Sequence, residues 1–305
     1  MGPVDVDVLL ATASALPRPD EDDAPLRAAL AAAGVVAATR AWDDPAVDWG
    51  AARACVIRST WNYVRHHDAF LDWAARCAAA TRLWNPLPVV RWNSHKGYLT
   101  ELARAGLAVV PTRLVRRGQA AGGGADLTAL AAAWDQVVIK PAVSAGSFRT
   151  LRVGRADRAR GQAHLDLVCA DQDALVQPYL SSVEGYGERA LVWIDGALTH
   201  AVRKSARFAG DPQRVSDAVA IAPDEAALAE RILAHVQAAG PGQVGSTPAP
   251  APLLYARVDL ARDADGRPCL MELELIEPSL FLTRSPEALA RLAAAIRKRV
   301  SQGWG

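Results

Sequence analysis

The sequence lacks the features that mark zinc-binding, secreted disulfide-rich and membrane-spanning proteins. Its four cysteines are scattered and form no Cys-x-x-Cys pair, so we expect buried thiols and neither a zinc site nor a disulfide framework. No apolar run approaches the ~18–20 residues that a membrane-spanning helix needs. The first residues include aspartates where a secretory leader carries Lys or Arg. These absences predict a cytoplasmic protein with no membrane partner.

The chain also has little net charge and no glycine-rich dinucleotide fingerprint. A formal charge of +1 leaves no basic excess for a nucleic-acid partner. Apolar residues are abundant: 51% of the 305 residues are hydrophobic and 22% are charged, which is enough for a buried core. At ~100–200 residues per domain, the length predicts two or three linked modules.

Residues 1–90 predict a small parallel α/β module. Strand-like runs at 4–11, 35–39 and 54–57 alternate with helical patterns that begin at Pro25 and Asp68. Most of the nine Trp residues lie in the first third of the chain, and an exposed apolar patch among them would favour a homodimer.

The remaining residues predict two α+β modules, 91–175 and 176–305. Asp195-Gly196 is a strong hairpin signal and joins strand-like runs at 189–194 and 197–203. Two further strands are expected at 253–260 and 269–276, and Ser285-Pro286 begins a closing helix.

Three acids lie on the last two predicted strands. Glu272 and Glu274 are two residues apart and therefore share a face, and a hairpin partner brings Asp259 beside them. Converging carboxylates repel unless a cation lies between them or one keeps its proton. Oxygen ligands at this density suit Mg²⁺ or Mn²⁺. We predict a metal site; the alternative is a solvated face with alternating polar residues.

A lysine and a loop of small residues lie earlier in the chain. Lys140 ends an apolar strand, and the loop that follows holds Ser144, Gly146 and Ser147. Backbone N–H groups in such a loop can cradle phosphate oxygens, and the lysine adds positive charge. Lys96, at the start of a helix, is a second candidate.

An extended segment follows the next strand-like run. Proline stiffens it, and its exposed backbone groups can read the edge of a purine base. Glu188 comes soon after and is placed to accept a hydrogen bond from a ribose hydroxyl. The segment consists of Gln177, Pro178, Tyr179 and Leu180.

In this order, over roughly residues 93–282, these features resemble the ATP-grasp superfamily. The resemblance implies two α+β subdomains that grip ATP, a lid (91–175) and a C-terminal subdomain with the metal site (176–305), after an α/β pre-ATP-grasp domain (1–90). It also implies that two lysines contact the phosphates, that residues 144–148 form a lid loop, that residues 177–180 bind adenine and that Glu188 binds ribose. Asp259 and Glu272 match the superfamily's magnesium ligands, whereas Glu274 stands where many members carry Asn.

The layout is most similar to the glutathione-synthetase-like branch and, within it, to the family of D-cycloserine synthetase. Four motifs carry this closer resemblance. They imply an enzyme of antibiotic biosynthesis that spends ATP, with Mg²⁺ or Mn²⁺, to cyclise O-ureido-D-serine to D-cycloserine. The motifs are Arg58-Ser-Thr-Trp-Asn-Tyr63, Leu83-Trp-Asn-Pro86, Arg91-Trp-Asn93 and Glu272-Leu-Glu-Leu-Ile-Glu-Pro-Ser279.

The chemistry of a carboxylate–nitrogen ligase assigns further roles. Lys140, Arg257 and Arg203 are the candidates for stabilising the transferred phosphoryl group and the acyl phosphate. Ligands of parallel sheets bind beyond the carboxyl ends of strands, so the loop after 54–57 is expected to form a substrate wall rather than an ordinary turn. Arg58 can meet a carboxylate, and Glu277 or Glu274 an α-ammonium. The substrate-binding candidates are Arg58, Ser59, Thr60, Trp61, Tyr63, Glu277 and Ser279.

Two other functions stay open from the residues alone. One is an intermolecular carboxylate–amine ligase, which needs a second, free amine substrate. The other is a nucleotide-binding module without ligase activity, although such a module usually loses its metal acids, and this chain keeps all three.

Overall fold

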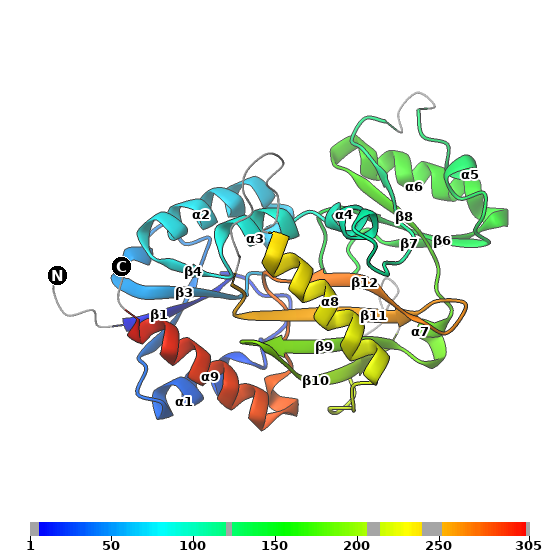
Figure 1. Cartoon of the computed structure of the whole chain (residues 1–305). Helices are drawn as coiled ribbons and strands as arrows, with labels where there is room; N and C mark the ends of the chain where they lie inside the picture. The colour runs from blue at the N-terminus through cyan, green and yellow to red at the C-terminus, as the bar shows by residue number, and fades with distance from the viewer. Residues whose placement is uncertain (1–5, 120–123, 206–213, 240–251, 303–305) are drawn as a thin grey trace.

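The computed structural model describes residues 6–119, 124–205, 214–239 and 252–302. Within these residues the strands form three four-stranded sheets. We call them first (strands within 6–84), second (113–178) and third (188–274) in chain order. The first sheet lies at one end of the molecule, the third in the middle, and the second, with its own helices, at the other end (Figure 1). No described helix is long and apolar enough to cross a membrane.

The first sheet is parallel, as the alternating strand and helix patterns predict, and has the order β2-β1-β3-β4. Helix α2 covers one face, and α1 lies with the C-terminal helix α9 on the other. The elements are β1 (Val6–Thr12), α1 (Asp23–Ala32), β2 (Ala37–Ala41), η1 (Trp49–Ala51), β3 (Ala52–Ser59), η2 (Tyr63–Arg65), α2 (His67–Ala80), β4 (Arg82–Trp84) and α3 (Leu87–Asn93).

The second sheet is antiparallel, with the order β5-β8-β6-β7, and α5 and α6 pack on one face of it. Gly161 allows α6 to approach closely, because a Cβ there would lie 2.6 Å from Leu127 and 2.9 Å from Val153. The elements are α4 (Tyr98–Arg104), β5 (Arg113–Val115), α5 (Leu127–Leu130), β6 (Gln136–Pro141), β7 (Leu151–Gly154), η3 (Arg155–Asp157), α6 (Arg158–Asp171) and β8 (Ala174–Pro178).

The third sheet is antiparallel, with the order β10-β9-β11-β12. Asp195 and Gly196 both have positive φ (42° and 95°), which is the two-residue hairpin turn that this dipeptide predicts. Ser285 caps α9 through a bond from Ala288 N, as expected. The elements are α7 (Ser182–Gly185), β9 (Glu188–Ile194), β10 (Ala197–Lys204), α8 (Pro223–Ala239), β11 (Tyr255–Arg262), β12 (Pro268–Glu274), η4 (Leu282–Arg284) and α9 (Pro286–Ser301).

The two faces of the third sheet have different partners. Leu191, Val258 and Leu273 face a core that α8 and α4 complete. On the opposite face, Val192 and Ile194 pack against residues of the first sheet and α9. The remainder of that face is turned toward the second sheet (Figure 1).

The domain boundaries expected at 90/91 and 175/176 stay predictions, and β8 lies across the second. The apolar patch that motivated the homodimer is not found at the Trp residues of the N-terminal module. Trp42, Trp49 and Trp73 are buried and in edge or tilted contact with one another. Trp61 and Trp84 of the same module are half-buried, and the homodimer stays a prediction.

Candidate active site

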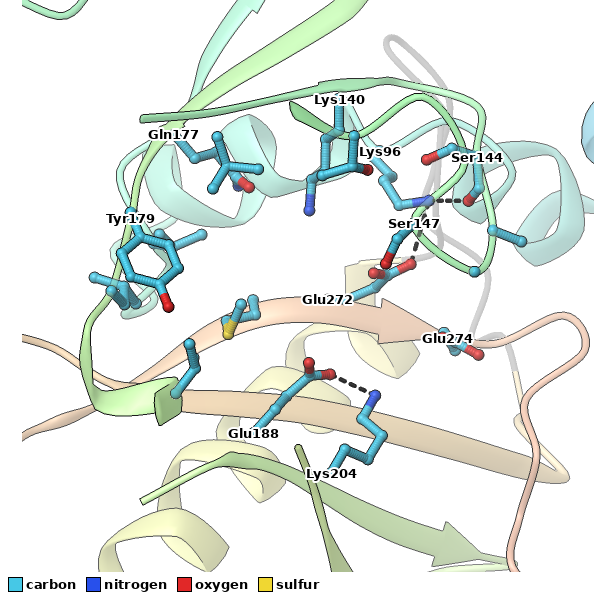
Figure 2. A pocket seen from close by; sticks show the side chains of 18 of the residues that line it. Lys96, Lys140, Ser144, Ser147, Gln177, Tyr179, Glu188, Lys204, Glu272 and Glu274 are labelled. Atoms are coloured by element: carbon cyan, nitrogen blue, oxygen red, sulfur yellow. Dashed lines mark hydrogen bonds and ion pairs between the residues drawn. The ribbon is translucent and has the colours of Figure 1, made fainter. Parts of the chain in front are cut away.

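A pocket lies between the second and third sheets (Figure 2). Its walls come from Lys96, which lies two residues before α4, from the loop after β6, from the segment after β8 and from the strands of the third sheet. All of the residues predicted to contact a nucleotide line it: Lys96, Lys140, Ser144, Gly146, Ser147, Gln177, Pro178, Tyr179, Leu180 and Glu188.

Strand alternation brings the acids of the third sheet to one face. In the β11–β12 ladder Asp259 pairs with Glu272, and Arg257 with Glu274. Directly opposed residues of an antiparallel pair share a face, as do residues two apart on a strand. Arg257, Glu272 and Glu274 line the pocket, while Asp259 lies beneath them with 1% of its surface exposed. The three acids therefore lie on the face of the third sheet that carries the pocket.

Ion pairs tie these acids to basic side chains. The Arg257 guanidinium donates to both oxygens of Asp259 at 2.8 Å, and Lys204 Nζ lies 2.7 Å from Oδ2. Arg257 also pairs with Glu274, and Lys204 with Glu188. Although burial raises the pKa of Asp259, Arg257 and Lys204 outweigh it and hold that pKa below its usual range. Burial raises the pKa of Glu274 to about 7, against the pull of Arg257.

Carboxylate oxygens suit a divalent cation by chemical type, but in this arrangement basic side chains stand between the acids. Among the residues that the structure describes, no group of three or more acidic, histidine or cysteine side chains is arranged to hold a metal. Lys96, Lys204 and Arg257 lie among the carboxylates instead. Glu272 and Glu274 keep about a quarter of their side chains exposed. Hard carboxylate oxygens on neighbouring strands are the ligands that Mg²⁺ prefers.

Lys96 and Lys140 differ in their surroundings. Lys96 Nζ is bonded to the carbonyl of Ser144 and lies 3.2 Å from Glu272. Within the described residues the Lys140 ammonium has no hydrogen bond or ion pair, and the side chain extends into the pocket (Figure 2). Burial lowers the pKa of Lys140, with Glu272 opposing that shift. An unpaired ammonium in such a place favours an anionic ligand.

The loop after β6 is fastened at its base. Lys96 N donates to the carbonyl of Ala142 at 2.8 Å, and Ser144 Oγ donates to the carbonyl of Pro141 at 3.1 Å. Beyond these bonds, Gly146 and Ser147 have positive φ (60° and 63°), so successive N–H groups turn in the way that anion-binding loops require.

One catalytic candidate is placed differently from the prediction. Arg203 is exposed, bonds to the carbonyl of Gly185 and does not line the pocket. Its neighbour Lys204 points into the pocket from β10 (Figure 2). The reason is strand alternation: Lys204 opposes Glu188 in the β9–β10 ladder, so Arg203 faces the other side. Regular counting from the Asp195-Gly196 turn would pair Arg203 with Glu188; the register shift between Leu198 and His200 moves Lys204 to that position instead, and the sequence gives no signal for this shift.

The predicted substrate residues gather around the segment that follows β12, not within the lining of the pocket just described. Trp61 Nε1 donates to the carbonyl of Glu277 at 3.0 Å, and Arg58 to that of Pro278 at 3.3 Å. Ser279 accepts from Arg18 at 2.9 Å.

Two substrate candidates carry buried polar atoms without partners. Arg58 Nη1 and Thr60 Oγ1 find no hydrogen-bond partner in the part of the chain that the structure describes, whereas the Ser59 hydroxyl bonds to that of Thr12. Arg58 is 3% exposed and lies 3.6 Å from Asp22. Tyr63 packs in the core beside Phe70.

Glu277 is a buried acid without a cation. It is 8% exposed, and the described residues supply no ion pair to its carboxylate. Burial, with help from Glu274, raises the pKa of Glu277 to about 8.

The chain is similar to known proteins both in sequence and in fold. Residues 8–85 match the family model described as D-cycloserine synthetase DcsG, N-terminal domain. The chain is 34% identical over 292 residues to "Cycloserine biosynthesis protein DcsG" from Streptomyces lavendulae, covering 92% of this chain and 94% of that protein. The crystal structure of D-cycloserine synthetase DcsG superposes with a TM-score of 0.85 at 33% identity, covering 96% of this chain and 99% of that one. A RimK domain ATP-grasp protein from Sphaerobacter thermophilus shares the fold, with a TM-score of 0.68 at 20% identity over 97% of this chain and 100% of that one.

The raised pKa of Glu277 predicts a pH-dependent stability difference between the wild type and Glu277→Gln. Between about pH 4.5 and pH 8 the unfolded wild type loses this proton while the folded protein keeps it, so wild-type stability falls as pH rises. The amide does not titrate. We expect the melting temperature of Glu277→Gln to exceed that of the wild type by an amount that grows to several degrees by pH 8.

Differential scanning calorimetry of the ligand-free protein at several pH values measures this difference. Glu230→Gln, the same change at an exposed position on α8, is the control and should give a flat, small difference. A Glu277→Gln difference that does not change with pH would show that this carboxyl titrates normally.

Proposed function

The chain belongs to the D-cycloserine synthetase family of ATP-grasp ligases, and from this premise we propose that it uses ATP to close the isoxazolidinone ring of D-cycloserine from O-ureido-D-serine. It is an ATP-dependent ligase. The observation that carries the proposal is one pocket in which phosphate-binding groups of the second sheet face the acids of the third. We also propose a role in antibiotic biosynthesis, because its relative from Streptomyces lavendulae is a cycloserine biosynthesis protein.

The nucleotide would lie along the wall formed by the second sheet. Gln177 to Leu180 would hold adenine, because Tyr179 N donates to Gln136 at 2.9 Å and Gln177 Nε2 to Thr112 at 2.8 Å, which fixes this extended segment. Glu188 would accept from the ribose. Lys140, Lys96 and the N–H groups of the 144–147 loop would receive the phosphates.

Asp259, Glu272 and Glu274 would hold Mg²⁺ (or Mn²⁺), which supplies charge neutralisation to the phosphates when bound. Lys204 and Arg257 already lie beside these acids. Since both basic side chains also line the pocket, they can turn toward phosphate oxygens.

The chemistry requires a carboxylate to become an acyl donor. The substrate carboxylate oxygen attacks the γ-phosphorus and ADP leaves; the ureido nitrogen that is bonded to oxygen then attacks the acyl carbon, loses its proton and expels phosphate. This nitrogen still carries the carbamoyl group, and hydrolysis of that group to CO₂ and NH₃ completes D-cycloserine. Arg257, Lys140 and Lys204 would stabilise the charge that develops in the first step. The 144–148 loop would exclude water, which otherwise hydrolyses the acyl phosphate. Arg65 of the N-terminal module already lies 5.7 Å from the Phe148 ring centroid.

The substrate walls are assigned to the segment after β12 and the loop after β3, which hydrogen bonds hold together. Arg58 would act there through its unpaired Nη1. The residues assigned are Arg58, Ser59, Thr60, Trp61, Tyr63, Glu277 and Ser279.

Ring closure needs no second substrate, and this separates it from intermolecular ligation. A cytoplasmic location stays a prediction. A homodimer also stays a prediction, and no Trp residue is among the exposed large apolar side chains of the described residues. The assay is incubation of the full-length protein with ATP, Mg²⁺ and O-ureido-D-serine, followed by mass spectrometry and phosphate measurement.

We expect ADP, phosphate and the cyclised product without a further amine. Glu272→Gln should reduce turnover by at least about 100-fold, because it removes a charge at the proposed metal site. ADP release that depends on a second amino acid would instead establish the intermolecular ligase, and no phosphate release with any amino acid would establish the binding module.

Neighbouring residues on β10 provide a matched test of the pocket. Lys204→Ala should lower kcat by about 100-fold or more, because it removes a positive charge near the proposed phosphoryl site and leaves Asp259 with Arg257 alone. Arg203→Ala should stay within about threefold of the wild type, since its side chain lies on the other face. Steady-state kinetics measures both, and equal losses in the two variants would show that the assignment by alternation is wrong.

A further inference from the structure

One acid on the substrate side of the active site has no cation beside it. Glu188, Asp259, Glu272 and Glu274 each pair with a lysine or arginine. In the described parts of the chain, Glu277 alone among these neighbouring acids lacks such a partner, although only 8% of its surface is exposed. A buried carboxylate is costly when it carries no counter-charge, so this position needs a reason.

We propose that Glu277 binds the α-ammonium group of an amino-acid substrate, so that the ligand supplies the missing cation. The inference rests on the proposed function and makes it more specific: of the two acids considered for this role, Glu274 is already held by Arg257.

The backbone around Glu277 is fixed from the N-terminal module. The Trp61 indole N–H donates to the carbonyl of Glu277, Arg58 donates to the carbonyl of Pro278, and Arg18 donates to the hydroxyl of Ser279. These bonds hold the backbone on both sides of Glu277, while its side chain has no basic partner among the described residues. A rigid backbone that presents one acid without a counter-charge is a preorganised binding site.

Glu277 follows the pocket-lining Glu274 by three residues. Arg257, which also lines the pocket, reaches the same segment, since its Nη1 donates to the carbonyl of Ser279 at 3.2 Å. Lys96 is bonded to Glu272 and to the carbonyl of Ser144 and makes no ion pair with Glu277. In an α-amino acid the ammonium and the carboxylate are borne by one carbon. Anchoring the ammonium here therefore keeps the carboxylate near Arg257 and the transferred phosphoryl group.

The electrostatics agree with this geometry. Burial and the neighbouring acids raise the pKa of Glu277 to about 8, so the acid is protonated in the ligand-free protein near neutral pH. An ammonium within contact distance favours the carboxylate form.

The test is a double-mutant cycle measured by isothermal titration calorimetry with a non-hydrolysable ATP analogue and Mg²⁺ present. The ligands are O-ureido-D-serine and 3-(ureidooxy)propanoate, which lacks only the α-amine. The proteins are the full-length wild type, Glu277→Gln, Glu277→Asp and the exposed control Glu230→Gln. Affinity for the ATP analogue reports whether each variant folds.

The wild type and Glu230→Gln should bind the amino compound at least about 30-fold more tightly than the desamino compound. In Glu277→Gln that preference should fall to within about threefold, while the ATP analogue binds as before. Glu277→Asp should keep part of the preference because it keeps the charge, and it decides the matter if Glu277→Gln does not fold.

A Glu277→Gln variant that retains the full preference would overturn the inference. So would a wild type that binds both compounds equally or neither. Binding with the expected preference but without ring closure in the turnover assay would overturn the proposed function and leave the ammonium site standing.

Discussion

The structure depends on how the outer edge of β12 is covered. This strand lies at the edge of the third sheet, where backbone groups would otherwise be unpaired. The backbone groups of Leu273 and Leu275 are hydrogen-bonded instead to buried side chains, those of Tyr98, Asn93 and Asn85. Beyond the strand, both oxygens of Asp22 accept from the segment that follows, at Leu280 N and Leu282 N. Side chains of the first hundred residues thus fix the segment that carries the acids of the active site.

Charge balance is the second constraint. Carboxylates and basic side chains alternate on the pocket face of the third sheet, and their attraction offsets much of the cost of burying them. Lys140 and Glu277 stand outside this balance, one on the phosphate side and one on the substrate side. A nucleotide brings the negative charge that Lys140 lacks, and an amino acid brings the positive charge that Glu277 lacks. The ligand-free site is therefore complementary to the two ligands together.

Period-two patterns, the Asp195-Gly196 turn and the Ser285 cap were sufficient to predict the order of most elements. They act over a few residues, so the sequence reveals them. The set of residues that lines the nucleotide pocket was predicted from the resemblance to the ATP-grasp superfamily. Long-range placement was beyond the local patterns. The prediction chose Arg203 over Lys204 because the sequence does not state which face of β10 meets the pocket. Short elements such as β4 and α3 were missed, although their motifs supply Asn85 and Asn93, whose bonds reach more than 150 positions along the chain.

The most direct test of the central claim is hydrogen exchange at the amides of the acid-bearing segment, measured by NMR in the wild-type protein. Leu273, Leu275, Leu280 and Leu282 each donate to a buried side chain of the N-terminal part. If those side chains fix the segment, the four amides exchange as slowly as Val192 in the central strand β9, through global unfolding. Exchange of these amides orders of magnitude faster than that of Val192 would contradict the account, because it would show that the segment opens locally without the rest of the fold.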